Sequence, residues 1–362
     1  MTYEHQADRR SFLKTGAIAS TALAAGASTL AKAASGPTTG DVAILRFLSA
    51  LEQIEADLWL QYAELGGVQD SELPGLPTGG NANYTAALNN LDADMSQYIH
   101  DNSDDEVSHH AFLNAFLAGI GATPVDLSPF ATLTGSQATG ANKTKKRLTN
   151  LMQLTVDTSW WTRYRSSTHN PDLDPTFVFP QVVPTLNTGH HTAIPRTDAD
   201  TTDKNQIQAI ANTAAFHFGY IEQGGTSLYP TLALRVTDPT VLRVLLSIGP
   251  SETMHFQTWH DKAGNAFSPP NNVTFGGLNF NLSPSGEDLQ PNLIMPEPVP
   301  FLDRKFPAVS IIRPVSTNPS IFGAVATALG FAADGLFIGQ TSAFFATLHA
   351  LAEAADAATR QC

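Results

Sequence analysis

Glu106-Val107-Ser108-His109 is one of two Glu-x-x-His stretches in this chain of 362 residues, and the other is Glu252-Thr253-Met254-His255. Residues three apart lie on one face of a helix, so the glutamate and the histidine of each stretch can reach the same ion. Carboxylate and imidazole ligands suit iron or manganese. A single stretch of this kind is a weak signal, but two of them inside long helical patterns predict a metal site between helices.

Four long helical patterns make up the middle of the chain. Apolar residues recur there with the period of an amphipathic helix. The patterns cover residues 41–65, 84–120, 205–236 and 240–263. They predict an all-α fold in which four helices share one core.

Each of these helical patterns places a glutamate within its apolar stripe. The four glutamates are Glu55, Glu106, Glu222 and Glu252. Glu52 falls at the edge of the first stripe. Burying an unpaired carboxylate is costly or forces its protonation, and the stripes contain no lysine or arginine. Four inward-facing glutamates therefore predict two metal ions among them.

The order Glu, Glu-x-x-His, Glu, Glu-x-x-His on four successive helices is similar to the ligand order of ferritin-like di-iron and di-manganese proteins. The stretch Leu45-Arg46-Phe47-Leu48-Ser49-Ala50-Leu51-Glu52-Gln53-Ile54-Glu55-Ala56 also resembles the first helix of the ferritin-like family that includes desiccation-related proteins. The resemblance implies a ferritin-like four-helix bundle over residues 41–264. Within it, residues 121–205 would form a long crossover insertion.

The resemblance also implies a role for each candidate ligand. Glu55 would be a terminal ligand, Glu106 a bridging ligand and His109 a terminal imidazole. The other half of the site would repeat these roles with Glu222, Glu252 and His255. The cofactor would be two iron ions, with manganese as the alternative.

Tyr62 and Tyr229 each follow a predicted ligand glutamate by seven residues, two turns along the same helix face. They are candidate catalytic residues that would hydrogen-bond the cluster or supply an electron. The alternative is that both are ordinary core tyrosines.

Two bridged metal ions can bind dioxygen or peroxide and move electrons as a pair. This favours an oxidoreductase or ferroxidase-type activity, with a dimanganese catalase-like enzyme as an alternative. Resemblance to desiccation-related proteins also allows a non-enzymatic stress-protective protein of the cell envelope, with a structural or vestigial metal site. A third hypothesis is a binding module whose loops 121–205 and 265–318 hold a partner. The sequence is compatible with a homo-oligomer.

Some residues depart from a regular bundle. Pro230 lies inside the third helical pattern and Gly249-Pro250 lies just before Glu252. Each proline removes a backbone hydrogen bond, so either the bundle bends around the site or the site has been lost. A rival alignment takes residues 143–165, which also look helical, as the third bundle helix with Asp157 as the ligand.

The first 33 residues are predicted to be a twin-arginine signal peptide. Arg9-Arg10-Ser11-Phe12-Leu13-Lys14 precedes an apolar run over 15–30, and Ala31-Lys32-Ala33 is a small-x-small cleavage pattern. We therefore expect a periplasmic or secreted protein.

Charge and composition argue against several kinds of binding partner and covalent link. The formal charge is −13 and no basic stripe is present, which argues against nucleic acid. The single cysteine, Cys362, allows no intrachain disulfide. Residues 265–362 are predicted to form a Pro-rich and helical C-terminal extension. Asp334 and Gln340 in its apolar stretch 319–359 argue against a membrane span.

Overall fold

The computed structural model describes residues 36–73, 75–166, 169, 176–282 and 322–361. The chain divides into two units, Met1–Gly36 and Pro37–Cys362, and all described helices belong to the second. The predicted signal peptide and most of the Pro-rich stretch 265–318 lie outside the described residues.

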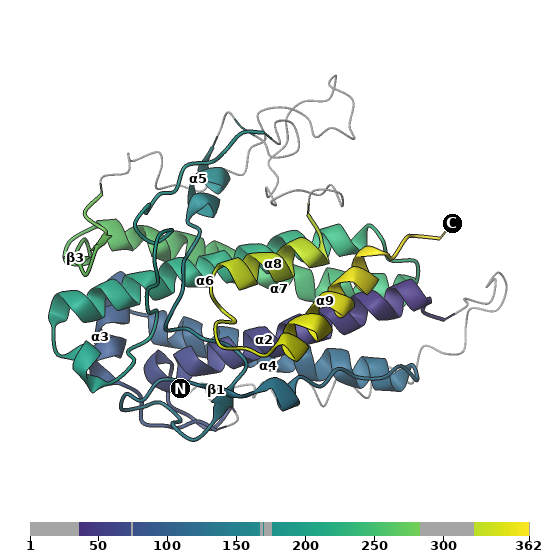
Figure 1. The fold of residues 1–362 in the computed structure, drawn as a ribbon, viewed down its shortest axis with the longest axis horizontal. Coiled ribbons are helices and arrows are strands. Elements are labelled where there is room, and N and C mark those ends of the chain that lie inside the picture. The colour runs from purple at the N-terminus through teal and green to yellow at the C-terminus, as the bar shows by residue number, and fades with distance from the viewer. Residues whose placement is uncertain (1–35, 74, 167–168, 170–175, 283–321, 362) are drawn as a thin grey trace, which may run out of the picture. The chain divides into compact units, whose positions relative to one another are not determined.

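Four long helices form the bundle, as Figure 1 shows. They are α2 (Thr39–Gly66), α4 (Met95–Gly119), α6 (Lys204–Ala233) and α7 (Pro239–Ala263). The most extensive helix contacts join α2 to α4 and α6 to α7. The predicted all-α fold with a four-helix bundle is therefore confirmed.

The start of α2 connects the two helix pairs. Thr38 is the N-cap of this helix, and Asp41 completes a capping box with it. The same carboxylate accepts hydrogen bonds from the backbone N–H of Thr237 at 2.7 Å and of Asp238 at 3.2 Å. Asp238 in turn caps α7, whose first residue is Pro239. One acidic side chain thus fixes the α6–α7 turn against the beginning of α2.

The second helical pattern was predicted as one helix over 84–120, and this is wrong. The structure has α3 (Ala82–Leu91) followed by α4. Between them, the Asp92 carboxylate accepts a hydrogen bond from the Asp94 N–H at 2.9 Å and forms an ion pair with Lys262 at 2.7 Å. An aspartate that bonds nearby backbone in this way competes with helix continuation.

The predicted helix over 143–165 is also wrong. Only α5 (Ser159–Arg165) is helical, and Lys146–Arg147 forms β2, which pairs antiparallel with β1 (Leu133–Thr134). The physical reason lies on α2. Asp57 accepts hydrogen bonds from the backbone N–H groups of Leu148 and Thr149 at 2.9 and 3.0 Å, so these groups are not available to a helix. The connection 121–205 also contains the short 3₁₀ helices η1 (Ser128–Phe130) and η2 (Asp198–Thr201).

The stretch after α7 contributes small elements and two further helices. η3 (Gly264–Phe267) leads to a hairpin of β3 (Thr274–Phe275) and β4 (Leu278–Asn279). The predicted helical stretch 319–359 forms α8 (Ala324–Ala333) and α9 (Ser342–Asp356). α9 packs on α2, and α8 packs on α9 and α6. Among the described residues, no helix combines the length and the apolar character needed to cross a membrane.

The internal prolines do not interrupt the bundle. α6 continues through Pro230 and α7 continues through Pro250. Gly249 permits the close approach of the two helices here, because a Cβ at this position would lie 2.8 Å from Tyr229 Cβ. The helices therefore keep Glu222 and Glu252 directed into the core.

Candidate metal centre

The bundle core contains a cluster of acidic side chains and two histidines. Two overlapping groups each have their potential ligand atoms within 4.8 Å of one another. The first group is Glu52, Glu106, His109 and Glu252, and the second is Glu106, Glu222, Glu252 and His255. All four glutamates are at most 1% exposed. Because Glu106 and Glu252 belong to both groups, they occupy the positions of bridging ligands.

The first group is arranged around His109. Its Nδ1 lies 3.3 Å from Glu52 Oε2, 3.0 Å from Glu106 Oε2 and 3.3 Å from Glu252 Oε1. One ring nitrogen carries at most one proton and cannot satisfy three carboxylates. Three oxygens that converge on one imidazole nitrogen therefore suit a shared metal ion.

The second group repeats this arrangement around His255. Its Nδ1 lies 3.1 Å from Glu106 Oε1 and 3.3 Å from Glu222 Oε2. Glu106 thus directs one carboxylate oxygen to each histidine. Each helix pair therefore supplies the same set of side chains. One helix of the pair, α2 or α6, provides a single glutamate, and the other, α4 or α7, provides the Glu-x-x-His residues.

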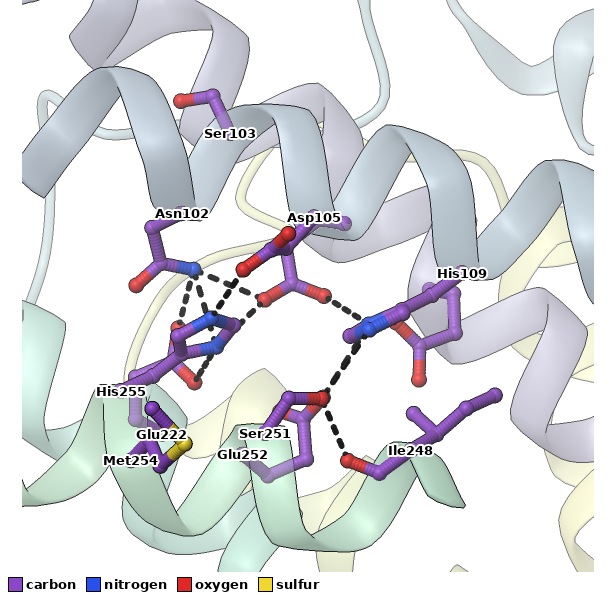
Figure 2. Close-up of polar contacts among 12 residues, drawn as sticks. Asn102, Ser103, Asp105, His109, Glu222, Ile248, Ser251, Glu252, Met254 and His255 are labelled. Atoms are coloured by element: carbon purple, nitrogen blue, oxygen red, sulfur yellow. Dashed lines mark hydrogen bonds and ion pairs between the residues drawn. The ribbon is translucent and has the colours of Figure 1, made fainter. Parts of the chain in front are cut away.

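The outer ring nitrogen of each histidine has its own partner, and Figure 2 shows both. His255 Nε2 lies 3.0 Å from Asp105 Oδ2, and His109 Nε2 lies 3.2 Å from Ser251 Oγ. Each partner immediately precedes the ligand glutamate of the opposite Glu-x-x-His. Such outer bonds fix the ring orientation and leave the Nδ1 atoms for metal.

Asn102 adds a donor to the His255 half of the site (Figure 2). Its Nδ2 donates to Glu106 Oε1 at 2.8 Å and to Glu222 Oε1 at 3.1 Å. Its own Oδ1 accepts from Trp259 Nε1 at 2.7 Å, which holds the amide in this orientation.

The pKa shifts of the clustered glutamates also fit a site that binds positive charge. Burial raises the pKa of Glu52 to about 7, with the neighbouring His109 lowering it and Glu106 raising it further. Burial and the surrounding carboxylates also raise the pKa of Glu252 well above its usual range. Glu106 is the exception: burial raises its pKa, but hydrogen bonds from His109 and His255 outweigh this and hold it low.

Several buried oxygens of the cluster have no hydrogen-bond donor within the described part of the chain. They include both carboxylate oxygens of Glu252 and Oε1 of Glu55. Leaving carboxyl oxygens buried without partners is costly, whether the group is charged or must take up a proton. A pair of multivalent cations would satisfy them, so the residues present fit a two-metal carboxylate site.

The structure places Glu52, rather than the predicted Glu55, in the first group. Glu55 is buried beside the cluster, and its pKa is raised by burial and then by Glu52 and Glu252. The sequence signal was available in the edge position of Glu52. Glu52 on α2 corresponds to Glu222 on α6, because each faces the histidine of the neighbouring helix.

The two candidate tyrosines lie in different places. Tyr229 donates its hydroxyl hydrogen to Glu52 Oε1 and so contacts the cluster. Tyr62 Oη instead lies 2.8 Å from His217 Nδ1. The rival ligand Asp157 lies in neither group and accepts hydrogen bonds from Ser159 and Gln181.

A comparison with family models gives a match to a ferritin-like domain over residues 40–265. The chain belongs to the ferritin-like domain family. The ferritin-like match includes α2, α4, α6 and α7 and therefore every residue of both candidate ligand groups. α8 and α9 lie beyond it. No curated protein and no solved structure matches the chain.

Proposed function

We propose that this ferritin-like protein binds two iron ions and acts as an oxidoreductase or ferroxidase on dioxygen or peroxide. The observation that carries the proposal is the convergence of three carboxylates on His109 Nδ1, repeated in part at His255 Nδ1. Such a pair of ions supplies two-electron redox chemistry when bound.

The two potential ligand groups would each hold one ion. Glu52 and His109 would hold one ion, Glu222 and His255 the other, and Glu106 and Glu252 both. The surrounding core excludes bulk water, since each histidine side chain is only 11% exposed. This strengthens electrostatic interactions inside the site.

Tyr229 would hold a proton at the site. Its hydroxyl donates to Glu52, and burial together with Glu52 and Glu252 raises its pKa well above the usual range. The phenol therefore stays protonated and keeps Glu52 oriented toward His109.

Manganese would fit the same donor atoms, which leaves peroxide disproportionation as the second activity. The two are distinguished by loading the metal-free protein without oxygen, once with Fe(II) and once with Mn(II). Rapid oxidation of two Fe(II) per chain on adding dioxygen or peroxide supports the ferroxidase-type function. Sustained oxygen release from peroxide by the manganese form alone would replace it with the catalase-like function. A Glu106→Gln variant removes a carboxylate that belongs to both metal positions, so it should lose activity in the iron form and in the manganese form.

We further propose that the protein acts outside the cytoplasm after export by the twin-arginine route. The support is the Arg9-Arg10 motif with the apolar run 15–30 and the Ala31-Lys32-Ala33 pattern. Fractionation of cells that produce the native chain tests it, with an Arg9→Lys, Arg10→Lys variant that should remain in the cytoplasm.

A further inference from the structure

A small apolar pocket opens on the surface between α6 and α7. Its volume is about 240 Å³. Two of its lining residues are Pro230 and Pro250, the prolines that depart from a regular bundle, one on each helix. The other lining residues are Tyr229, Leu245, Leu246, Gly249 and Thr253. None of these described residues is charged, so the pocket does not suit an ion.

The pocket also offers few hydrogen bonds to a bound molecule. Thr253 Oγ1 donates its hydrogen to the Gly249 carbonyl at 3.3 Å, and the Tyr229 hydroxyl donates to Glu52. Both hydroxyl hydrogens of the lining are therefore already used. An enclosed water typically makes about three hydrogen bonds to polar groups, whereas apolar cavities stay dry and bind apolar molecules. The lining thus favours an apolar occupant over water.

Tyr229 connects this pocket to the metal centre. The residue is 2% exposed and lines the pocket, and its hydroxyl contacts Glu52, which belongs to the first potential ligand group. One side chain therefore spans from the pocket to a ligand. One further turn toward the site, Gly225 faces Glu252, because a Cβ at Gly225 would lie 2.6 Å from Glu252 Oε2. No bulky side chain of Gly225 stands between α6 and this carboxylate.

The metal centre also has a polar approach, between α4 and α7. The side chains of His109 and His255 are each 11% exposed there, and the Asp105 side chain that bonds His255 is 42% exposed. Fe(II) and peroxide favour this approach, since charged and hydrogen-bonding molecules lose free energy when they leave polar partners. Dioxygen has no such requirement, and apolar surroundings favour it over water.

The size of the pocket narrows the choice of occupant further. Pockets for drug-sized ligands typically have volumes of about 300–1,000 Å³, which is larger than the volume between α6 and α7. Tyr229 closes the inner end, so only a small molecule can go further.

We propose that the pocket between α6 and α7 binds dioxygen and admits it to the metal centre past Tyr229. The proposal rests on the proposed function and narrows its substrate to dioxygen, with peroxide restricted to the polar approach. Movement of the Tyr229 ring opens the way inward, and its hydrogen bond to Glu52 closes it again.

The first experiment probes the pocket without metal. Xenon is a small apolar probe that binds dry apolar cavities, and a xenon magnetic-resonance titration of the metal-free mature chain should show saturable binding. Leu246→Trp and Thr253→Phe, which fill the pocket from two different turns of α7, should each abolish it. The matched control is Leu234→Trp, because Leu234 is 57% exposed against 59% for Leu246 and does not line the pocket. This control should bind xenon as the wild type does.

The second experiment measures access to the loaded centre. The same proteins are loaded with Fe(II) without oxygen and mixed rapidly with either dioxygen or peroxide. The variants that lose xenon should react with dioxygen roughly tenfold more slowly, as expected when an access step limits the rate. Their iron stoichiometry and their rate with peroxide should stay at the wild-type values, and Leu234→Trp should match the wild type with both oxidants.

The outcomes separate this proposal from the proposed function. Absence of saturable xenon binding in the wild type, or binding that survives both pocket variants, would overturn the proposal. An unchanged rate with dioxygen after loss of xenon, or equal slowing with both oxidants, would overturn it too. A wild type that sediments as a dimer and a Leu246→Trp variant that sediments as a monomer would assign the pocket to a second copy of the chain instead. A folded protein that binds no iron would overturn the proposed function and the access role with it, while the xenon titration would still decide whether the pocket takes an apolar gas.

Discussion

Replacing Asp105 by asparagine should weaken one metal position and spare the other. Asp105 Oδ2 accepts the outer N–H of His255 at 3.0 Å, whereas His109 is held by the hydroxyl of Ser251 at 3.2 Å. Ser251 already donates its only hydrogen to the Ile248 carbonyl at 2.6 Å, so it meets His109 Nε2 as a neutral acceptor. The His255 position alone therefore has a charged acceptor behind its imidazole, and such bonds are roughly twice as strong as neutral ones.

Loss of an outer partner of a metal-binding histidine typically costs about 10–100-fold in metal affinity. The Asp105 side chain is 42% exposed, so solvent screens its charge and the lower end applies. We expect roughly a tenfold loss, about 1.4 kcal/mol, at the His255 position. The affinity of the His109 position should stay within about twofold.

Anaerobic calorimetric titration of the metal-free protein with Co(II) resolves the two binding steps. Asp101→Asn is the matched control, because it removes the same charge from α4 at a side chain that is 40% exposed and lies outside both ligand groups. The reverse change, Ser251→Asp, should tighten the His109 position. Equal weakening of both steps by Asp105→Asn, or an effect no larger than that of the control, would refute the assigned role of Asp105.

Three further predictions follow from the same geometry. Burial raises the pKa of Glu52 to about 7 in the metal-free protein, so between about pH 4.5 and 7 this carboxyl binds more protons in the folded state than in the unfolded state. The metal-free protein should therefore become less stable, by a few kcal/mol, as the pH rises from about 4.5 to 7. Thermal unfolding curves should show this loss without metal and not with bound metal. Gly225→Ala would place a Cβ 2.6 Å from Glu252 Oε2, so metal stoichiometry or affinity should fall in a titration although helix propensity improves by about 1 kcal/mol; unchanged metal binding would contradict the assigned position of Glu252. Arg147→Ala leaves its buried partner Glu64 unpaired and should cost about 3–5 kcal/mol in denaturant unfolding, with a loss under 1 kcal/mol counting against the importance of this ion pair.

The bundle and most of its site were predictable from the sequence because both depend on local periodicity. Stripe positions placed Glu106, Glu222 and Glu252 in the core, and Glu-x-x-His spacing placed each histidine in a potential ligand group with its own glutamate. The choice between Glu52 and Glu55 was not predictable from one helix. It depends on how far α2 is rotated against α4, which is set by packing across the whole interface.

The two wrong helix predictions share a physical cause, which is an aspartate side chain that accepts hydrogen bonds from backbone N–H groups. Asp57 takes two backbone hydrogens from the segment that was predicted as a helix over 143–165. Asp92 ends α3 in a similar way through Asp94. Tyr62 has helical spacing from Glu55, but its hydroxyl points to His217, whose pairing with Asp334 joins residues 117 positions apart. Periodicity within a helix contains no information about such distant partners.

Metal content is the most direct test of the two-metal centre. The mature protein should be reconstituted anaerobically with Fe(II), freed of excess metal and measured by mass spectrometry beside a Glu106→Gln, Glu252→Gln variant that removes both shared carboxylates. The geometry predicts two iron ions per chain in the wild type and almost none in the variant, with both proteins showing the same helical circular dichroism. A well-folded wild type that retains no iron, or a variant that retains as much as the wild type, would contradict a metal centre at this site.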